Sequence, residues 1–319
     1  KIGQGFQEIF SGFGSAIRDA FGFTVVKSGD KKSKVGEHFK KIGDGLTITK
    51  NKLEELEGKI LEAKNADGVT IEAVKGAIKG ANDVFAQLIA SLIKLAGVTN
   101  DGADVGDTAS AATTVAANKD SVEAIIAGVR EIIKVAEKSD VKIEKGNAGG
   151  VVNAAATTDA TAALNANGAA TAGAAANLAA EVAKADAWAM IDKIQNAKAD
   201  NAQLNANAAN KDAGELAVGT PGHANGAGAA TSADLAAAVA FKAMTKGGKF
   251  SAAANETDLA KAAGVSAVNK VLGVLDIIIR KTVAGNLEKV REAVKGIKYS
   301  DTSESDTSQS DITQSVVTK

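Results

Sequence analysis

The stretch VSAVNKVLGVLDIIIRKTVAGNLEKVREAVKGIK, residues 265–298, contains the longest series of helix-spaced apolar side chains in this sequence. Its large apolar residues return every three or four positions, and this spacing places them on one face of a helix. They are Val268, Val271, Leu272, Leu275, Ile278, Ile279, Val283, Leu287, Val290 and Val294. An apolar face of this length needs a large partner surface.

A candidate partner lies at the other end of the chain, in residues 2–21. Its apolar residues have the same helical spacing. They are Ile2, Phe6, Ile9, Phe10, Phe13, Ile17 and Phe21. We expect the two helices to pack together, which would bring the ends of the chain to one pole of an elongated molecule.

Three more amphipathic helices are predicted between these ends. The first spans about 35–60, between a turn at Ser28-Gly29-Asp30 and a break at 65–68. The others span Thr70–Ala96, where Gly97 is expected to take the left-handed position after the helix, and Ser121–Glu137. Strand-like runs are short, at Thr24–Val26 and Leu46–Thr49, so the fold class is all-α.

The middle of the chain, Gly146–Ser232, consists mostly of Ala, Asn, Gly and Thr and has few large side chains to fill a core. Leu178–Gln195 is expected to be helical, with Trp188 as its anchor. The stretch GTPGHANGAGAA, residues 219–230, is expected to form exposed loops. The two ends would thus form a fixed scaffold around a middle segment that tolerates changes in its residues. This organisation favours a display surface over an active site.

Composition excludes several functions. The 37 basic and 38 acidic residues nearly cancel, so no overall field attracts nucleic acid or an anionic membrane. The chain has no cysteine and therefore no disulfide, thiolate nucleophile or Cys-containing zinc site. Its longest candidate for a membrane span, Val271–Ile279, is short and is broken by Gly273 and Asp276.

Catalytic groups are scarce, and we expect neither an enzyme nor a cofactor or metal site. His38 lies in a Lys-rich helix and is expected to be exposed or half-buried, and His223 lies in a Gly-rich loop. Residues Lys246–Phe250, KGGKF, lack the spacing of a phosphate-binding loop. Gly247 or Gly248 is instead expected to end a helix whose Phe241 and Met244 face a core.

A basic cluster is the one candidate ligand site. Lys27, Lys31, Lys32 and Lys34 could bind a sulfated polysaccharide or an acidic partner. The alternative is an ordinary solvated surface, because nearby acidic residues interrupt the cluster.

Three segments resemble the variable large proteins of relapsing-fever Borrelia, the VlsE-like variable surface lipoproteins. They are AAAVAFKAMTKGGKF at 236–250, the stretch 265–298, and KKSKVGEHFKKIGDGLTITKNKLEEL at 31–56. The first is similar to a constant segment of that family. The residues of this chain assigned to that constant segment are Phe241, Met244, Lys246, Gly247, Gly248, Lys249 and Phe250. One departure is visible, because Phe241-Lys242-Ala243 stands in place of the more usual Leu-Arg-Gly.

The resemblance implies a lipoprotein of the outer membrane surface, held by a lipidated N-terminal Cys and acting in antigenic variation and immune evasion without catalysis. It implies an elongated helical bundle with the terminal helices near the membrane and the Ala/Gly/Asn-rich part at the distal end. Residues 1–298 would form one domain with a variable portion at about 100–232. Composition, and not the resemblance, predicts a disordered polar tail at 299–319, which has almost no large apolar residue. The implied partners are host antibodies; the alternative is a complement component, a matrix protein or a glycosaminoglycan.

The segment Ala236–Phe250 carries one further expectation. Its large apolar residues need an apolar partner, so most of the segment is expected to be buried in the folded protein.

Overall fold

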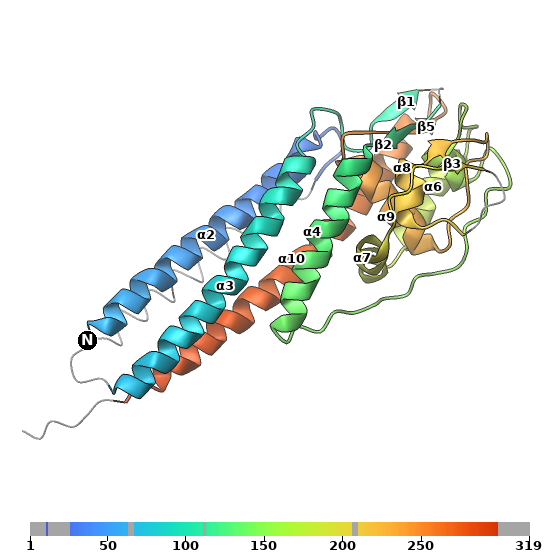
Figure 1. Cartoon of the computed structure of the whole chain (residues 1–319). Helices are drawn as coiled ribbons and strands as arrows, with labels where there is room; N and C mark the ends of the chain where they lie inside the picture. The colour runs from blue at the N-terminus through green and yellow to red at the C-terminus, as the bar shows by residue number, and fades with distance from the viewer. Residues whose placement is uncertain (1–10, 12–25, 63–66, 111–112, 206–209, 299–319) are drawn as a thin grey trace, which may run out of the picture.

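The computed structural model describes residues 11, 26–62, 67–110, 113–205 and 210–298. Most of the Phe-rich stripe at 2–21 and the whole tail at 299–319 lie outside the described residues. Four long helices, α2 (Ser33–Leu61), α3 (Gly68–Val98), α4 (Lys119–Lys138) and α10 (Thr257–Lys295), run alongside one another as a rod (Figure 1). Smaller elements gather at one end of this rod, and we call them the cap.

The rod helices form where the apolar spacing predicts them, to within a few residues. Helix α2 buries an apolar stripe against α3 that includes Phe39, Ile42 and Leu46. Asp67 caps α3 by accepting a hydrogen bond from Val69 N–H. The position predicted for Gly97 is wrong: α3 continues through it, and Thr99 ends the helix by donating from its hydroxyl to the Leu95 carbonyl.

Helix α10 is buried over much of its length because it contacts α3 and α4 in the rod and α6, α7 and α9 in the cap. Both α3 and α10 are long and apolar enough to cross a membrane by length and composition, contrary to the expectation from Val271–Ile279. Most of the apolar stretch of α10 is buried inside this fold, as in the core helix of a soluble protein.

The cap contains α5 (Ala160–Asn165), α6 (Ala174–Lys184), α7 (Ala187–Asn196), α8 (Ala213–Val218) and α9 (Ser232–Met244). The expectation that Gly146–Ser232 has little core is wrong for α5 and α8, which lie inside that range and are almost wholly buried. Helix α9 begins where that range ends and is equally buried. Every residue of α5 is buried, as is every residue of α9 after its first. Alanine has a small side chain, so neighbouring helices can approach closely enough for methyl groups to fill the interior.

Two local expectations for the middle also need correction. The helix predicted at Leu178–Gln195 is interrupted between α6 and α7, where Asp186 caps α7 by accepting from Trp188 N–H; the Trp188 ring is only partly buried. Residues 219–230 are not uniformly exposed, because 226–229 are buried.

Short strands accompany the helices, although the sequence has no long alternating run that predicts them. In one sheet β5 (Gly247–Ala252) lies between β1 (Thr108–Ser110), which is parallel to it, and β2 (Val115–Ala117), which is antiparallel. Strands β3 (Gln203–Leu204) and β4 (Thr220–Pro221) form a second, two-stranded pair. The fold remains mainly helical, as expected.

Candidate functional site

The rod and the cap meet at a buried cluster of Lys32 and residues 241–250, which we call the joint. Lys32 immediately precedes α2, and residues 241–250 connect the end of α9 to β5. The joint therefore links the first rod helix to the strand at the centre of the three-stranded sheet.

The Lys32 ammonium group lies among backbone carbonyl groups of the joint. Its Nζ donates to the carbonyl oxygens of Lys242 (3.1 Å), Thr245 (2.7 Å), Gly247 (2.9 Å) and Gly248 (3.3 Å). The side chain is fully buried, and this burial lowers its pKa to about 8. At neutral pH the group is therefore still a cation, held by oxygen dipoles.

This arrangement removes Lys32 from the predicted surface patch. The other three lysines are exposed, but Lys31 pairs with Asp104 at 2.5 Å and Lys34 pairs with Glu37 at 2.6 Å. These hydrogen-bonded carboxylates raise the pKa of both lysines. The positive charge at this surface is consequently smaller than the sequence indicates.

A second buried lysine, Lys242, extends the joint into the cap. Its Nζ donates to the Leu164 carbonyl at 2.5 Å and lies 5.7 Å from the centre of the Phe250 ring. Burial, with a smaller contribution from the Lys32 charge, lowers the pKa of Lys242 to about 7. Lys32 thus connects the start of α2 to the end of α9, and Lys242 connects α9 to the end of α5.

The two glycines of the joint allow its turn. Helix α9 ends at Met244, before the glycines, where Thr245 donates from its hydroxyl to the Phe241 carbonyl. Gly247 and Gly248 then adopt positive φ values of 76° and 47°. The prediction that a glycine ends the helix is therefore wrong: the glycines form the turn into β5.

The turn has the opposite polarity to a phosphate-binding loop. Carbonyl oxygens point into it, whereas phosphate loops direct N–H groups toward their anion. The expected burial of the segment is confirmed: Phe241, Met244 and Phe250 are at most 1% exposed. Lys246 is exposed, and Lys249 pairs with Asp107.

The predicted exposure of His38 is wrong. Its ring is buried between α2 and α10, with Nε2 2.9 Å from Asp276 Oδ1. His223, by contrast, is exposed, and its Nδ1 accepts from the Asn225 N–H. Within the part of the chain that the structure describes, no three His, Asp or Glu side chains converge as metal ligands.

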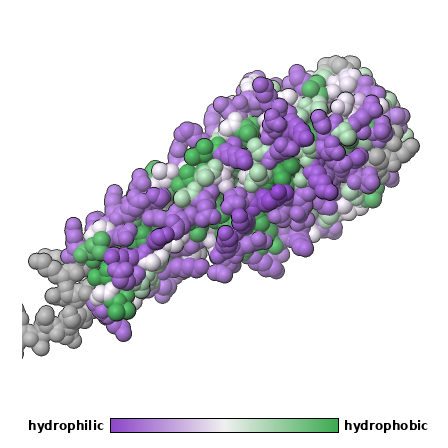
Figure 2. All heavy atoms as spheres, viewed as in Figure 1, coloured by the Kyte–Doolittle hydropathy of each residue, from purple (hydrophilic) through white to green (hydrophobic). Residues whose placement is uncertain are grey.

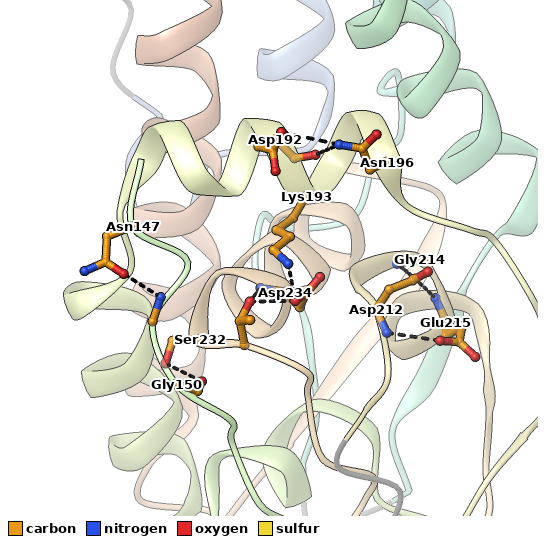
Figure 3. A network of polar contacts seen from close by, with 12 residues as sticks. Asn147, Gly150, Asp192, Lys193, Asn196, Asp212, Gly214, Glu215, Ser232 and Asp234 are labelled. Atoms are coloured by element: carbon orange, nitrogen blue, oxygen red, sulfur yellow. Dashed lines mark hydrogen bonds and ion pairs between the residues drawn. The ribbon is translucent and has the colours of Figure 1, made fainter. Parts of the chain in front are cut away.

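Short polar contacts around aspartates join helices of the cap and cap their first turns. Figure 3 shows Lys193 facing Asp234 at 3.2 Å, and Asp212 joined to Gly214 and Glu215 in a capping box at the start of α8. On the face shown in Figure 2, polar side chains cover much of the cap. The cap thus combines an interior of small residues with anchored, polar loops.

Comparison with known proteins identifies the family. A model of the Borrelia lipoprotein family matches residues 6–294. Variable large protein 14 of Borrelia hermsii is 70% identical over 308 residues, which are 96% of this chain and 85% of that protein. The chain belongs to the Borrelia lipoprotein family, among the variable large proteins.

Two further similar proteins agree with this assignment. Variable large protein 12 of Borrelia hermsii is 54% identical over 95% of this chain and 83% of its own length. The crystal structure of the Lyme disease variable surface antigen VlsE of Borrelia burgdorferi is similar with a TM-score of 0.71 and 26% identity. This match covers 92% of this chain and 96% of VlsE. The resemblance of this chain to the variable large proteins is confirmed.

The joint of this family member was only partly visible in its sequence. Lys32, Val35, Phe39, Ile42 and Leu46 follow one helical spacing, so Lys32 occupies the position of an apolar residue on the buried face. That spacing is a signal for its burial. The partners of Lys32 are backbone carbonyl groups more than 200 residues away, which side-chain patterns do not reveal.

Proposed function

We propose that this chain is a variable surface antigen: a lipid-anchored protein of the outer membrane surface that acts in antigenic variation and immune evasion, without catalysis. One observation carries the proposal. The large apolar residues of the family-like segment 241–250 are buried in the joint, while residues of the 100–232 portion form polar loops on the cap. Membership in the variable large proteins and similarity to a variable surface antigen support the same function.

The arrangement suits display because structural and surface positions are separate. Buried positions of the rod and the joint keep the fold, whereas exposed loops accept substitutions at little energetic cost. The cap lies at the end of the rod opposite to the end of α2, the start of α3 and the end of α10 (Figure 1). Asp67 N–H donates to the Lys298 carbonyl at that opposite end, which we assign to the membrane side.

A pair of chimeras tests the proposal. In the first, residues 100–232 are replaced by the aligned residues of Variable large protein 12; in the second, residues 233–298 are replaced. Serum antibodies raised against the folded chain are expected to lose most of their binding to the first chimera and to retain it for the second. Circular dichroism checks that both chimeras remain helical.

The opposite antibody result would reject the proposal. If folded chimeras lost binding only when 233–298 were exchanged, the segment that contains α9, the joint residues 241–250 and α10, and not the 100–232 portion, would carry the displayed surface. Binding retained in the first chimera would show that 100–232 does not determine recognition.

Binding of a host ligand through Lys27, Lys31 and Lys34 stays a prediction. It calls for a pull-down of serum and matrix proteins at low and physiological salt, with these three lysines neutralised in a control. Lys32 should be left intact, because its ammonium group supports the joint.

A further inference from the structure

Two Asn-Gly dipeptides occur in the chain, Asn167-Gly168 and Asn225-Gly226. In such a pair the glycine peptide nitrogen can attack the side-chain amide carbon of the asparagine. Glycine favours this attack because it has no Cβ and reaches many backbone conformations. The reaction requires a mobile side chain and a peptide nitrogen free of other bonds, so the fold decides which pair can react.

Asn167-Gly168 meets both requirements. Asn167 is exposed, and among the described residues its side chain has no hydrogen-bond partner. Gly168 N–H likewise donates to no described group, and a Cβ built on Gly168 would have no atom within 4 Å. The main chain of Asn167 is fixed on both sides, since its N–H donates to the His223 carbonyl and its carbonyl accepts from the Thr113 hydroxyl.

Asn225-Gly226 has the same sequence but meets neither requirement. The Asn225 side-chain Nδ2 donates to the Ala155 carbonyl at 2.9 Å, and Gly226 N–H donates to the His223 carbonyl at 3.1 Å. Gly226 is buried, and a Cβ built on it would lie 2.2 Å from Asn165 Oδ1. Both reacting groups are therefore held, and reaction requires local opening of the fold.

We propose that Asn167 is a site of spontaneous deamidation. Gly168 N loses its proton and bonds to Cγ of Asn167, and the amide nitrogen leaves as ammonia with that proton. Water then opens the resulting succinimide ring at one of its two carbonyls. The product is an aspartate or isoaspartate at position 167, and no other reactant is needed.

The product changes the surface of the cap. A neutral amide becomes a carboxylate beside the main-chain contacts to Thr113 and His223. Isoaspartate also lengthens the main chain by one methylene group between these contacts. This chemistry is independent of the proposed function; if the cap is the displayed surface, the molecules on a cell would differ with their age.

The test is peptide mapping of the full chain after timed incubation at mildly alkaline pH and 37 °C. Trypsin separates the two pairs, because cleavage after Lys145 and Lys184 releases one and cleavage after Lys211 and Lys242 releases the other. In the native protein, deamidation at Asn167 is expected to be at least about tenfold faster than at Asn225, since the latter must first open locally.

Two controls keep the result interpretable. In denaturant the two sites are expected to react at similar rates, because their dipeptides are identical. Gly168→Ala is expected to keep the native unfolding transition, since the site has open space, and to slow the reaction at position 167. Equal rates at the two sites in the native protein, faster reaction at Asn225, or an unmodified Asn167 would overturn the proposal.

Discussion

At the residue scale, the joint depends on the Lys32 cation, whose side chain contacts backbone carbonyl groups and forms no ion pair with any residue that the structure describes. Lys32 Nζ satisfies carbonyl groups that face one another after the end of α9. A buried ammonium group is costly alone, yet the same group donates to the carbonyl groups of Thr245 and Gly248, which would otherwise be buried without this donor. The side chain and the turn therefore require each other.

Replacing Lys32 with methionine should show this dependence. Lys32→Met keeps much of the buried apolar volume but leaves the carbonyl groups of Thr245 and Gly247 without this donor. We expect the free energy of unfolding to fall by about 3 kcal/mol. Lys34→Met, at an exposed position nearby, should change it by no more than about 0.5 kcal/mol. Denaturant unfolding followed by circular dichroism measures both; equal effects would contradict the role of Lys32.

The two buried lysines also predict how stability depends on pH. Their folded pKa values of about 8 for Lys32 and about 7 for Lys242 lie below the ordinary value of 10.5. Between these values the unfolded chain binds more protons, so the contribution of both groups to stability rises with pH, by up to about 1.4 kcal/mol per pH unit for each. Below about pH 6 both lysines are charged in either state, and this contribution no longer changes.

Lys242→Met isolates one of these contributions. The difference in unfolding free energy between the native chain and this variant should shift in favour of the native chain as pH rises from 7 to 9.5. Comparing the two proteins at each pH cancels the titration of groups that they share. A difference that stays constant over this range would show that Lys242 does not titrate with a lowered pKa.

At the element scale, α10 joins the rod to the cap by close backbone approach as well as by apolar contacts. Gly264 of α10 lies against the loop that precedes β1: a Cβ built on it would lie 2.7 Å from the Gly106 Cα and 3.2 Å from the Ala243 Cβ. Further along the same helix, Gly285 has open space around it. One helix thus contains a glycine required by packing and a glycine without such a role.

Alanine substitutions separate these two cases. Gly264→Ala should lower the free energy of unfolding by about 1–3 kcal/mol, because the added methyl group forces α10 away from the loop. Gly285→Ala should raise it by up to about 1 kcal/mol through helix propensity. Thermal and denaturant unfolding of the two variants provide the comparison. Similar stabilisation by both would show that α10 does not approach this loop closely.

At the scale of the whole molecule, the joint connects segments that are far apart in the chain. Lys32 and Gly247 are separated by 215 residues, and Lys242 and Leu164 by 78 residues. Access to residues 236–250 therefore requires the cap and the rod to separate or unfold locally. Antibody binding to residues 236–250 therefore tests whether the cap and the rod are folded together.

Antibodies against a peptide of residues 236–250 should bind the isolated peptide and the denatured chain. They should bind the native chain at least about tenfold more weakly, because the segment must first open. Antibodies against residues 142–151, which are mostly exposed, serve as the control and should bind native and denatured protein similarly. Equal binding of the 236–250 antibodies to the peptide and to the native chain would contradict the burial of the joint.

The sequence determined the parts of this protein that depend on local periodicity. Apolar spacing placed α2, α3, α4 and the long apolar face of α10, because a helix that buries one face repeats its apolar residues every three or four positions. It also predicted the burial of 236–250, whose large side chains need partners. Residue similarity, and not periodicity, pointed to the variable large proteins.

Only the tertiary structure decided which small or charged residues became interior. The spacing of alanine residues does not show which of them are buried. The packed interior of α5 and α9 therefore depends on how closely neighbouring helices approach. Lys32 and His38 looked like surface residues, yet their partners come from the α9–β5 turn and from α10. The two Asn-Gly pairs also differ only through the tertiary structure, because they have one sequence but different contacts. Burial of a polar group depends on donors and acceptors that the folded chain brings together from distant positions.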